Sequence, residues 1–478
     1  MPGMRRTRGI LLPLGLVLLS LCPRPAAATN PAATAYAALP PDSVVQSLID
    51  ARAKLTPNAG LVVGLVDARG KRMLSAGTLD GKDSKTPDGR TVFEIGSVTK
   101  TFTAALLADM VRRGEVRLEQ PVGELLPDTV KVPSRGGRQI RLLDLATQSS
   151  GLPRLPDNFA PKDAANPYAD YTPAQMFAFL SSYTLTRDPG AQYEYSNLGV
   201  GLLGFALARH AGAPYERLVR DRVAGPLEMA DTRIALTPEE QARLAPGHDA
   251  GGERVANWDL PTLAGAGALR STGNDMLAFV AACMKADTTT ALGRDFFTAT
   301  TPVRATTIPH MRIGLAWHVR ETDDSRIVWH NGGTGGYHAF IGFDRDRGRG
   351  VVILCNSSVN IDDIGMHVLD STIAISPPEP PKHHEQVTLT PEQLQPLVGR
   401  YELAPGAVIT VTLADAQLSA QLTGQGAFEI FPESPTDFFL KVVDATLTFE
   451  RDAGGAATAV TLHQNGHDTR GRRLEDAK

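Results

Sequence analysis

Residues 93–114 constrain this chain more than any other stretch, because they predict a packed helix with two reactive groups at its start. From Val98 onward, apolar residues recur at steps of three and four, which is the period of a helix with one buried face. Gly114 follows two arginines and suits the helix end, where left-handed backbone and cations are both favoured. Ser97 and Lys100 are three residues apart, so their side chains lie on the same side of the helix.

This pair has the chemistry of a nucleophile and its base. A serine hydroxyl is a weak nucleophile at neutral pH until a neighbouring base accepts its proton. Lys100 can be that base if burial lowers its pKa toward neutrality. The free backbone N–H groups at a helix start can bind a developing oxyanion. A Ser-x-x-Lys spacing also arises by chance, as a capping serine and a surface lysine, so the interpretation needs further motifs.

Two further polar clusters follow along the chain. Tyr-Ser-Asn at residues 195–197 comes directly before an apolar, helix-like stretch, and His-Asn-Gly at residues 330–332 follows a strand-like run. Each cluster lies at a helix start or a strand-to-turn junction, where backbone groups are free and side chains can converge. Taken singly, the first is an ordinary turn and the histidine a structural residue. Their order after the serine pair makes both candidates for one site.

Together, the three clusters resemble the serine β-lactamase and penicillin-binding-protein superfamily. The closer resemblance is to the branch with class C β-lactamases, soluble DD-carboxypeptidases and related esterases. It covers residues 40–375 and includes the stretches 146–153, 225–232 and 265–276. It implies an α+β, β-lactamase/transpeptidase-like fold, in which an antiparallel sheet is flanked by helices and accompanied by an all-helical region.

The resemblance also implies a role for each residue. Ser97 is expected to be the nucleophile, Lys100 its proton partner and Tyr195 the general base that passes the proton to the leaving group. The backbone amides of Ser97 and Gly333 are expected to form the oxyanion hole. The expected substrate-binding residues are Asn197, which orients the substrate amide, His330, Asn331 and Gly332.

His330 and Asn331 depart from the Lys-Thr-Gly that many relatives carry, although His-Thr-Gly occurs among DD-carboxypeptidases of this branch. A tyrosine with an ordinary pKa of about 10 needs nearby positive charge to act as a base at neutral pH. An ordinary histidine supplies such charge only below about pH 6.5. We therefore expect carboxylate-bearing substrates to bind better as the pH falls through this range. The class A Glu-x-x-Leu-Asn motif is absent, so deacylation cannot use that glutamate.

The first 28 residues have the pattern of a signal peptide. Three arginines precede an apolar run over residues 10–21, and residues 26–28 are alanines suited to cleavage. The apolar run is too short to span a bilayer comfortably. Lipoprotein anchoring through Cys22 is the alternative, although Leu21 stands where such sequences carry a small residue. We therefore expect a periplasmic or secreted protein.

The sequence pattern changes after residue 375. Residues 376–388 are rich in proline and predict a stiff, extended linker. Residues 389–478 carry short alternating runs separated by Gly, Asp or Pro, at the spacing of a small antiparallel barrel. This segment resembles the lipocalin-like barrel that follows the catalytic domain in some members of the branch.

Composition excludes other classes of protein. The 478 residues are 21% charged and 42% hydrophobic with a net charge of −4, which is typical of a globular protein without a nucleic-acid surface. Cys283 and Cys355 can form one disulfide, but each lies in its own apolar element, so we interpret them as separate buried thiols. No metal-ligand spacing is present, and residues 383–385 (His-His-Glu) lie in the predicted linker.

The sequence therefore predicts an exported serine hydrolase that works through an acyl-enzyme, without metal or cofactor. The favoured activity is that of a D-alanyl-D-alanine carboxypeptidase or D-amino-acid peptidase on peptidoglycan-type peptides. A class C-like β-lactamase and an esterase are alternatives, since the three differ only in their pocket walls. A non-catalytic penicillin- or ligand-binding protein, with an apolar ligand in the barrel, is the alternative of a different class.

Overall fold

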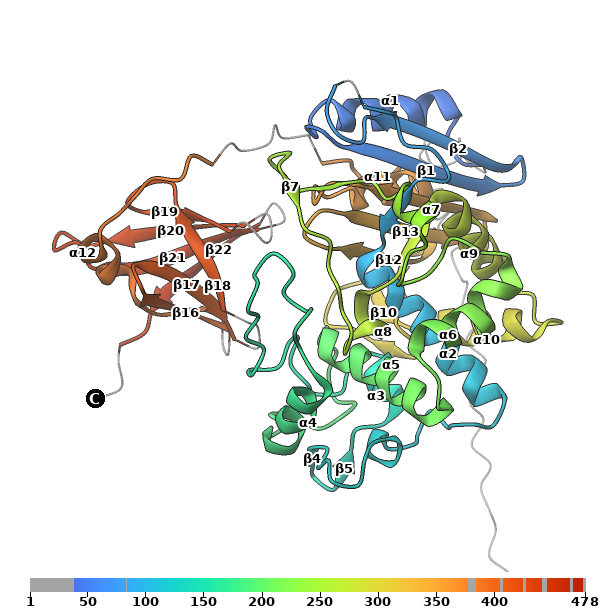
Figure 1. The fold of residues 1–478 in the computed structure, drawn as a ribbon, viewed down its shortest axis with the longest axis horizontal. Coiled ribbons are helices and arrows are strands. Elements are labelled where there is room, and N and C mark those ends of the chain that lie inside the picture. Colours follow the sequence, from blue (N-terminus) through green and yellow to red (C-terminus); the bar gives the residue numbers. More distant parts are fainter. Residues whose placement is uncertain are drawn as a thin grey trace, which may run out of the picture. The chain divides into compact units, whose positions relative to one another are not determined.

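The computed structural model describes residues 38–82, 84–376, 384–404, 407–423, 427–440, 445–464 and 467–475 (Figure 1). The predicted signal peptide, Cys22 and most of the predicted linker lie outside the described residues. No helix in the described ranges is long and apolar enough to cross a membrane.

An antiparallel eight-stranded sheet forms the centre of residues 38–376 (Figure 1). Side by side, its strands are β2 (Gly70–Gly77), β1 (Gly60–Asp67), β14 (Arg349–Cys355), β13 (His338–Asp344), β12 (Arg326–Gly333), β11 (His318–Glu321), β10 (Met311–Ile313) and β9 (Arg304–Ala305). The sequence predicts strands at residues 60–67, 71–77, 327–329, 340–343 and 351–355, and each of these runs lies within one of the five long strands. The three short ones were not predicted, because two to four residues show no periodicity.

Both faces of this sheet are covered by helices, which explains the continuous apolar run of β1. Val62 packs toward the cluster that contains α2 (Thr99–Arg112) and α9 (Gly273–Lys285). Its neighbour Val63 packs toward α1 (Asp42–Ala53) and α11 (Asp362–Leu369). Successive residues of a strand therefore belong to different cores, and this alternation decides which strand residues reach the site.

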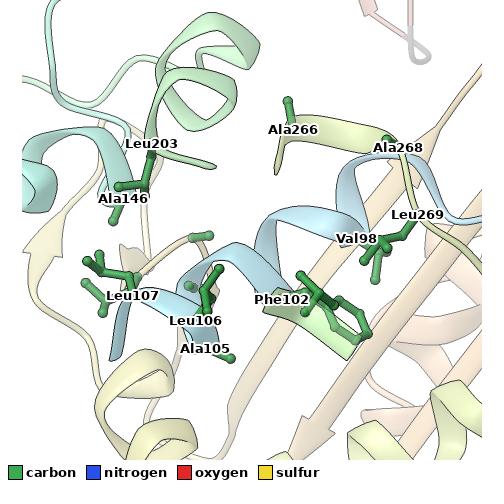
Figure 2. Close-up of a cluster of buried hydrophobic side chains, with 14 of the residues drawn as sticks. Val98, Phe102, Ala105, Leu106, Leu107, Ala146, Leu203, Ala266, Ala268 and Leu269 are labelled. Atoms are coloured by element: carbon green, nitrogen blue, oxygen red, sulfur yellow. The ribbon is translucent and has the colours of Figure 1, made fainter. Parts of the chain in front are cut away.

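Helix α2 runs through the larger core. The sequence predicts one buried face, but every residue from Thr99 to Met110 is buried, including the polar ones. Phe102 stacks on Phe279 of α9, with ring centroids 4.2 Å apart. Figure 2 shows α2 with its apolar side chains and, around them, Ala146, Leu203, Ala266, Ala268 and Leu269 from later segments. Packing on all sides fixes the start of α2, where Ser97 and Lys100 lie.

The other helices and short strands of this region surround the start of α2 or cover the core. They are the 3₁₀ turns η1 (Gly96–Val98) and η2 (Val122–Leu125), the helices α3 (Leu142–Ala146), α4 (Pro173–Ser182), α5 (Asn197–Ala211), α6 (Tyr215–Val219), α7 (Pro238–Gln241), α8 (Ala264–Gly267) and α10 (Ala291–Thr300), the turns η3 (Arg220–Ala224) and η4 (Gly225–Leu227), and the paired strands β3 (Val92–Glu94) with β8 (Arg270–Thr272), β4 (Ser134–Arg135) with β5 (Arg138–Gln139), and β6 (Gly247–His248) with β7 (Arg254–Val255).

Some predicted boundaries are wrong. The sequence around residues 141–151 predicts Asp144 as the N-cap residue of a helix. Asp144 is instead the third residue within α3, and its carboxylate accepts a hydrogen bond from the backbone of Arg141 at 3.0 Å. The last helix before the predicted linker ends at Leu369, where the sequence predicted it to reach residue 374. The sequence predicts that either Ser271 or Thr272 caps α9, and Thr272 is the one that does, accepting from the Asp275 amide at 3.2 Å.

The two cysteines are free and buried, which confirms their interpretation as separate thiols. Cys283 packs in the core that contains α2, whereas Cys355 packs in the core on the other face of the sheet. Burial raises the pKa of both thiols. A sheet therefore separates two unreactive sulfhydryl groups.

Residues 384–475 contain a closed antiparallel barrel, which confirms the predicted all-β segment. It follows α12 (Pro391–Leu394) and η5 (Gln395–Leu397), and its strands are β15 (Gly399–Ala404), β16 (Ala407–Ala414), β17 (Gln417–Leu422), β18 (Ala427–Pro432), β19 (Asp437–Phe439), β20 (Ala445–Arg451), β21 (Ala457–Gln464) and β22 (His467–Arg473). The sequence did not predict β15 and β22. Inward side chains such as Tyr401, Leu418 and Phe438 pack on one another, so the barrel's own residues fill its interior.

Candidate active site

Ser97 lies in the tight turn η1, where β12 comes into backbone contact. Gly96 has a φ of +47°, and a Cβ there would come within 2.7 Å of the Gly333 carbonyl oxygen. A Cβ on Gly332 would come within 2.8 Å of the Ser97 backbone nitrogen. Glycine is therefore required on both sides of this contact. It brings the segments that carry the amides of Ser97 and Gly333, the predicted oxyanion-hole donors, against each other.

Lys100 lies one helical turn further on and is completely buried. Its Nζ is 2.9 Å from Ser97 Oγ, 2.9 Å from Asn197 Oδ1 and 2.6 Å from the Ala266 carbonyl oxygen of α8. Burial, and then the charge of Arg154, holds the pKa of Lys100 well below its usual range. This environment therefore favours the neutral amine over the charged one, relative to a lysine in water.

The hydrogen bonds of Lys100 also orient its lone pair. The oxygens of Asn197 and Ala266 can only accept, so they take the two N–H groups of a neutral amine. The remaining position on Nζ faces Ser97 Oγ, 2.9 Å away. The arrangement can therefore accept the proton of the Ser97 hydroxyl.

Tyr195 contacts the same serine, because its hydroxyl and the Ser97 side chain are hydrogen-bonded. Lys100 Nζ lies 5.0 Å and Arg154 Cζ 5.2 Å from the centre of its ring. Burial nevertheless raises the pKa of Tyr195 to about 12, and the charge of Arg154 only partly opposes this effect. Desolvation thus outweighs the nearby positive charge that Tyr195 would need to act as a base at neutral pH, and the phenol is protonated there.

The segment around residue 150 holds the Tyr195 turn in place. Gln148 Oε1 accepts from the Ser196 amide at 2.8 Å, and Ser196 Oγ donates to the Pro153 carbonyl at 2.6 Å. The Asn197 amide donates to the Arg154 carbonyl at 3.0 Å. Asn197 Nδ2 donates to the Tyr168 hydroxyl at 3.3 Å, so its side chain bridges Lys100 and an aromatic wall. The stretch 146–153 thus supports the site by hydrogen bonding.

His330 is brought to Tyr195, with ring centroids 6.4 Å apart. Its Nδ1 is 2.5 Å from the Asn331 carbonyl oxygen, which can only accept, so Nδ1 carries the proton and Nε2 is a bare acceptor. Nε2 has no hydrogen-bond partner among the described residues. Burial is the largest cause that holds the pKa of His330 well below its usual range. The expectation that His330 gains a proton near pH 6.5 is therefore wrong for the protein without substrate.

Asn331, in contrast, is not brought to the other site residues. In the register of β12 on β13, His330 is opposite Ile341, which faces the core of α2, while Asn331 is opposite Phe340, which faces the other core. Asn331 Nδ2 donates to Asp362 of α11 at 2.5 Å. The expectation that its side chain contacts substrate is thus corrected by the two-residue period of a strand.

Sequence reasoning missed two residues of this region. His318, on the unpredicted strand β11, lies with its ring centroid 5.2 Å from that of His330, and its Nε2 is 2.9 Å from the Tyr193 hydroxyl. Burial lowers the pKa of His318 to about 4. Arg154 is the second missed residue. Its position directly after the stretch 146–153 is the only sequence feature that could have pointed to it.

A metal site is not formed within the described part of the chain, where no three His, Cys, Asp or Glu side chains gather. His384, from the predicted linker, pairs with Glu433 at 3.0 Å and stacks on Phe439 at 4.5 Å between ring centroids. Its role is thus structural.

Comparisons with known proteins agree with this geometry. The Beta-lactamase family matches residues 45–367, and a domain of unknown function, DUF3471, matches residues 383–473. The chain is 34% identical over 205 residues to the D-alanyl-D-alanine-carboxypeptidase/endopeptidase AmpH of Escherichia coli K12. This match covers 42% of this chain and about half (51%) of the AmpH protein. It is 27% identical over 350 residues to a β-lactamase of Pseudomonas fluorescens, covering 66% and 93% of the two chains.

Among solved structures, the chain is similar to a β-lactamase/D-alanine carboxypeptidase from Yersinia pestis complexed with citrate. The TM-score is 0.59 at 24% identity, covering 69% of this chain and 98% of that one. This likeness is one of fold, and it confirms the predicted β-lactamase-like architecture.

Proposed function

Because this chain belongs to the β-lactamase family of serine hydrolases, we propose that it acts through an acyl-enzyme on Ser97. The observation that carries the proposal is the contact of a buried amine with a serine hydroxyl: Lys100 Nζ lies 2.9 Å from Ser97 Oγ. A lysine in this environment is a base rather than a surface charge. The hydrogen bond between the Tyr195 hydroxyl and the Ser97 side chain supports the assignment of Tyr195 to the second proton transfer.

Acylation then proceeds as follows. Lys100 accepts the Ser97 proton, Ser97 Oγ bonds to the substrate carbonyl carbon, and the amides of Ser97 and Gly333 bind the oxyanion. The bond from carbon to the leaving nitrogen breaks, and that nitrogen gains a proton through the Tyr195 hydroxyl, which Lys100 re-protonates. We assign the first proton to Lys100 rather than to Tyr195, because the pKa of Tyr195 is raised to about 12. Water next attacks the ester carbon, the bond from that carbon to Ser97 Oγ breaks, and one proton of the water passes through Lys100 to Ser97 Oγ. This step releases the acid and restores Ser97.

The favoured substrates are peptides that end in D-Ala-D-Ala. This choice is supported by the similarity to AmpH, which spans only about half of that protein. A β-lactamase is the second candidate, supported by the similarity to the Pseudomonas fluorescens protein. Esters are the third class, since the proposed attack needs only a carbonyl carbon and a leaving group.

A substrate panel tests the proposal. We would measure kcat/KM for a diacetyl-Lys-D-Ala-D-Ala peptide, nitrocefin and p-nitrophenyl butyrate, with wild type, Ser97→Ala and Lys100→Arg. Ser97→Ala should abolish turnover of all three. Lys100→Arg should lose roughly 100-fold or more, because a guanidinium cannot accept a proton. Acylation by penicillin without turnover of any substrate would favour the non-catalytic binding protein instead.

We also propose export to the periplasm or the medium, on the signal-peptide pattern of residues 1–28. The proposed division is a catalytic domain at residues 40–375, a linker at 376–388 and a barrel at 389–478. It is supported by the separate hydrophobic cores on the two sides of residue 380. Mass spectrometry of the protein isolated from its compartment would locate its N-terminus.

A further inference from the structure

Arg154 presents an unpaired guanidinium group at the edge of the site. Its side chain is exposed, with Cζ 5.2 Å from the centre of the Tyr195 ring, and it makes no ion pair or side-chain hydrogen bond within the described residues. Its main chain is fixed, because its carbonyl accepts from the amides of Asn197 and Leu198 at 3.0 and 3.2 Å. The charge is therefore held beside the reactive groups yet remains open to solvent.

Three other arginines of residues 38–376 form ion pairs that leave them less open to an anionic ligand. Arg112 contacts Asp295 at 2.8 Å, Arg270 contacts Glu94 at 3.1 Å, and Arg304 contacts Asp144 at 2.7 Å. A guanidinium offers parallel N–H groups that match a carboxylate. An open guanidinium next to Tyr195 is thus suited to an anionic group of a bound molecule.

The opposite wall cannot supply this contact. His330 uses its Nδ1–H on the Asn331 carbonyl and presents only the acceptor Nε2, which repels a carboxylate. The side chain of Asn331 is bonded to Asp362 on the other face of the sheet. Lys100 is buried, and its N–H groups bond to groups of the protein. Strand β12 therefore lacks the cation that many relatives carry at the position of His330.

We propose that Arg154 binds a carboxylate of the substrate, so that anion recognition lies on the wall of Tyr195 and Asn197 rather than on β12. This inference rests on the proposed function. The carboxylate belongs either to the acyl part of the substrate or to its leaving group, and matched substrate pairs separate these sources.

The test uses full-length wild type and Arg154→Gln with two pairs of substrates. The first pair is mono-p-nitrophenyl glutarate and p-nitrophenyl butyrate, which differ by a carboxylate in the acyl part. The second is diacetyl-Lys-D-Ala-D-Ala and its C-terminal amide, which differ in the leaving group. In one pair, Arg154→Gln should lower kcat/KM for the carboxylate member by about 10- to 100-fold more than for the neutral member, the size of a charge-assisted hydrogen bond. Any effect of Arg154 on Tyr195 cancels in this ratio.

Arg117→Gln is the matched control, since Arg117 is exposed and lies beyond the far end of α2, a helix of 14 residues or about 21 Å. It should leave both ratios unchanged. Arg154→Lys keeps the charge but not the paired N–H groups, so it should lose part of the preference, and it replaces Arg154→Gln if that variant does not fold.

Equal losses within both pairs for Arg154→Gln, or an unchanged preference in Arg154→Lys where the glutamine variant fails to fold, would overturn the inference. The proposed function is judged separately. If wild type is labelled by a fluorophosphonate and hydrolyses the neutral ester, the acyl-enzyme stands whatever Arg154 does. If it is not labelled, the proposed function itself fails.

Discussion

At the residue scale, burial sets the chemistry of the site. Lys100, Tyr195 and His330 all lie where charge is poorly solvated, and each is shifted toward its neutral form. A neutral lysine can accept a proton and a neutral tyrosine can donate one. A histidine whose pKa is lowered is a weak base, and it offers its bare nitrogen as a hydrogen-bond acceptor. These three environments divide the roles more clearly than residue type alone.

Lys100 should make the stability of the protein depend on pH. The pKa of Lys100 in the folded protein is lowered from the usual lysine value of 10.5, so between the two values the unfolded chain holds a proton that the folded protein lacks. Stability therefore rises with pH in that window. Relative to Lys100→Met, wild type should gain up to about 1.4 kcal/mol per pH unit between pH 7 and 9 in urea unfolding. Parallel stability curves would show that folded Lys100 keeps its proton.

His330 should remain neutral in the unliganded protein from pH 8 to 5.5, since its pKa is lowered. The KM of mono-p-nitrophenyl glutarate relative to p-nitrophenyl butyrate should therefore not improve as the pH falls through 6.5. Steady-state kinetics across this range, with His330→Gln as the uncharged reference, measure the ratio. A selective fall in KM for the carboxylate ester in wild type alone would mean that His330 does titrate.

At the scale of elements, helix α11 connects strands β12 and β13 by hydrogen bonds on the face of the sheet opposite Ser97. Asp362, in its first turn, accepts from Asn331 Nδ2 of β12 at 2.5 Å and contacts His338 Nε2 of β13 at 2.9 Å. In the sheet, His338 is opposite Gly333, whose amide is a proposed oxyanion donor. The carboxylate thus holds the strand pair from the face opposite Ser97.

Removing the Asp362 carboxylate should lower both the stability of the fold and the rate of Ser97 acylation. Asp362→Ala leaves two half-buried donors without their acceptor, which should lower the free energy of unfolding by about 1–3 kcal/mol. It should also slow acylation of Ser97 at saturating substrate, because Gly333 is less firmly positioned. Urea unfolding and single-turnover labelling measure the two effects, and Asp323→Ala, at an exposed position, is the control. A loss of stability with unchanged acylation would limit Asp362 to a structural role.

Local geometry explains which parts of the site could be predicted. Ser97 and Lys100 share one helical turn, so their spacing was enough. The prediction for Asn331 was wrong because it assigned substrate binding to every residue of the His-Asn-Gly motif. In a strand, the side chains of His330 and Asn331 point to opposite faces of the sheet. Ala266 and Arg154 come from distant segments whose contacts leave no periodicity in the sequence. Likewise, β9 to β11 are too short to show a pattern.

At the scale of the whole molecule, the described ends of the predicted linker belong to different regions. The Ser376 amide donates to Asp363 at 3.0 Å, while the Val387 amide donates to the Pro432 carbonyl at 2.9 Å. The cores on the two sides consist of different residues. A chain that ends at Pro380 should therefore fold and keep Ser97 reactive, as judged by its melting temperature and by fluorophosphonate labelling. An insoluble or unreactive product would mean that the barrel completes the catalytic domain.

The central claim is a covalent bond to Ser97. The direct measurement is mass spectrometry of the intact protein and its peptides after brief exposure to penicillin, with Ser97→Ala and the exposed-site variant Ser43→Ala alongside. We predict one added penicilloyl mass, located on the peptide that contains Ser97, in wild type and in Ser43→Ala. We predict none in Ser97→Ala. An adduct that persists in Ser97→Ala, or that maps to another serine in wild type, would contradict the account.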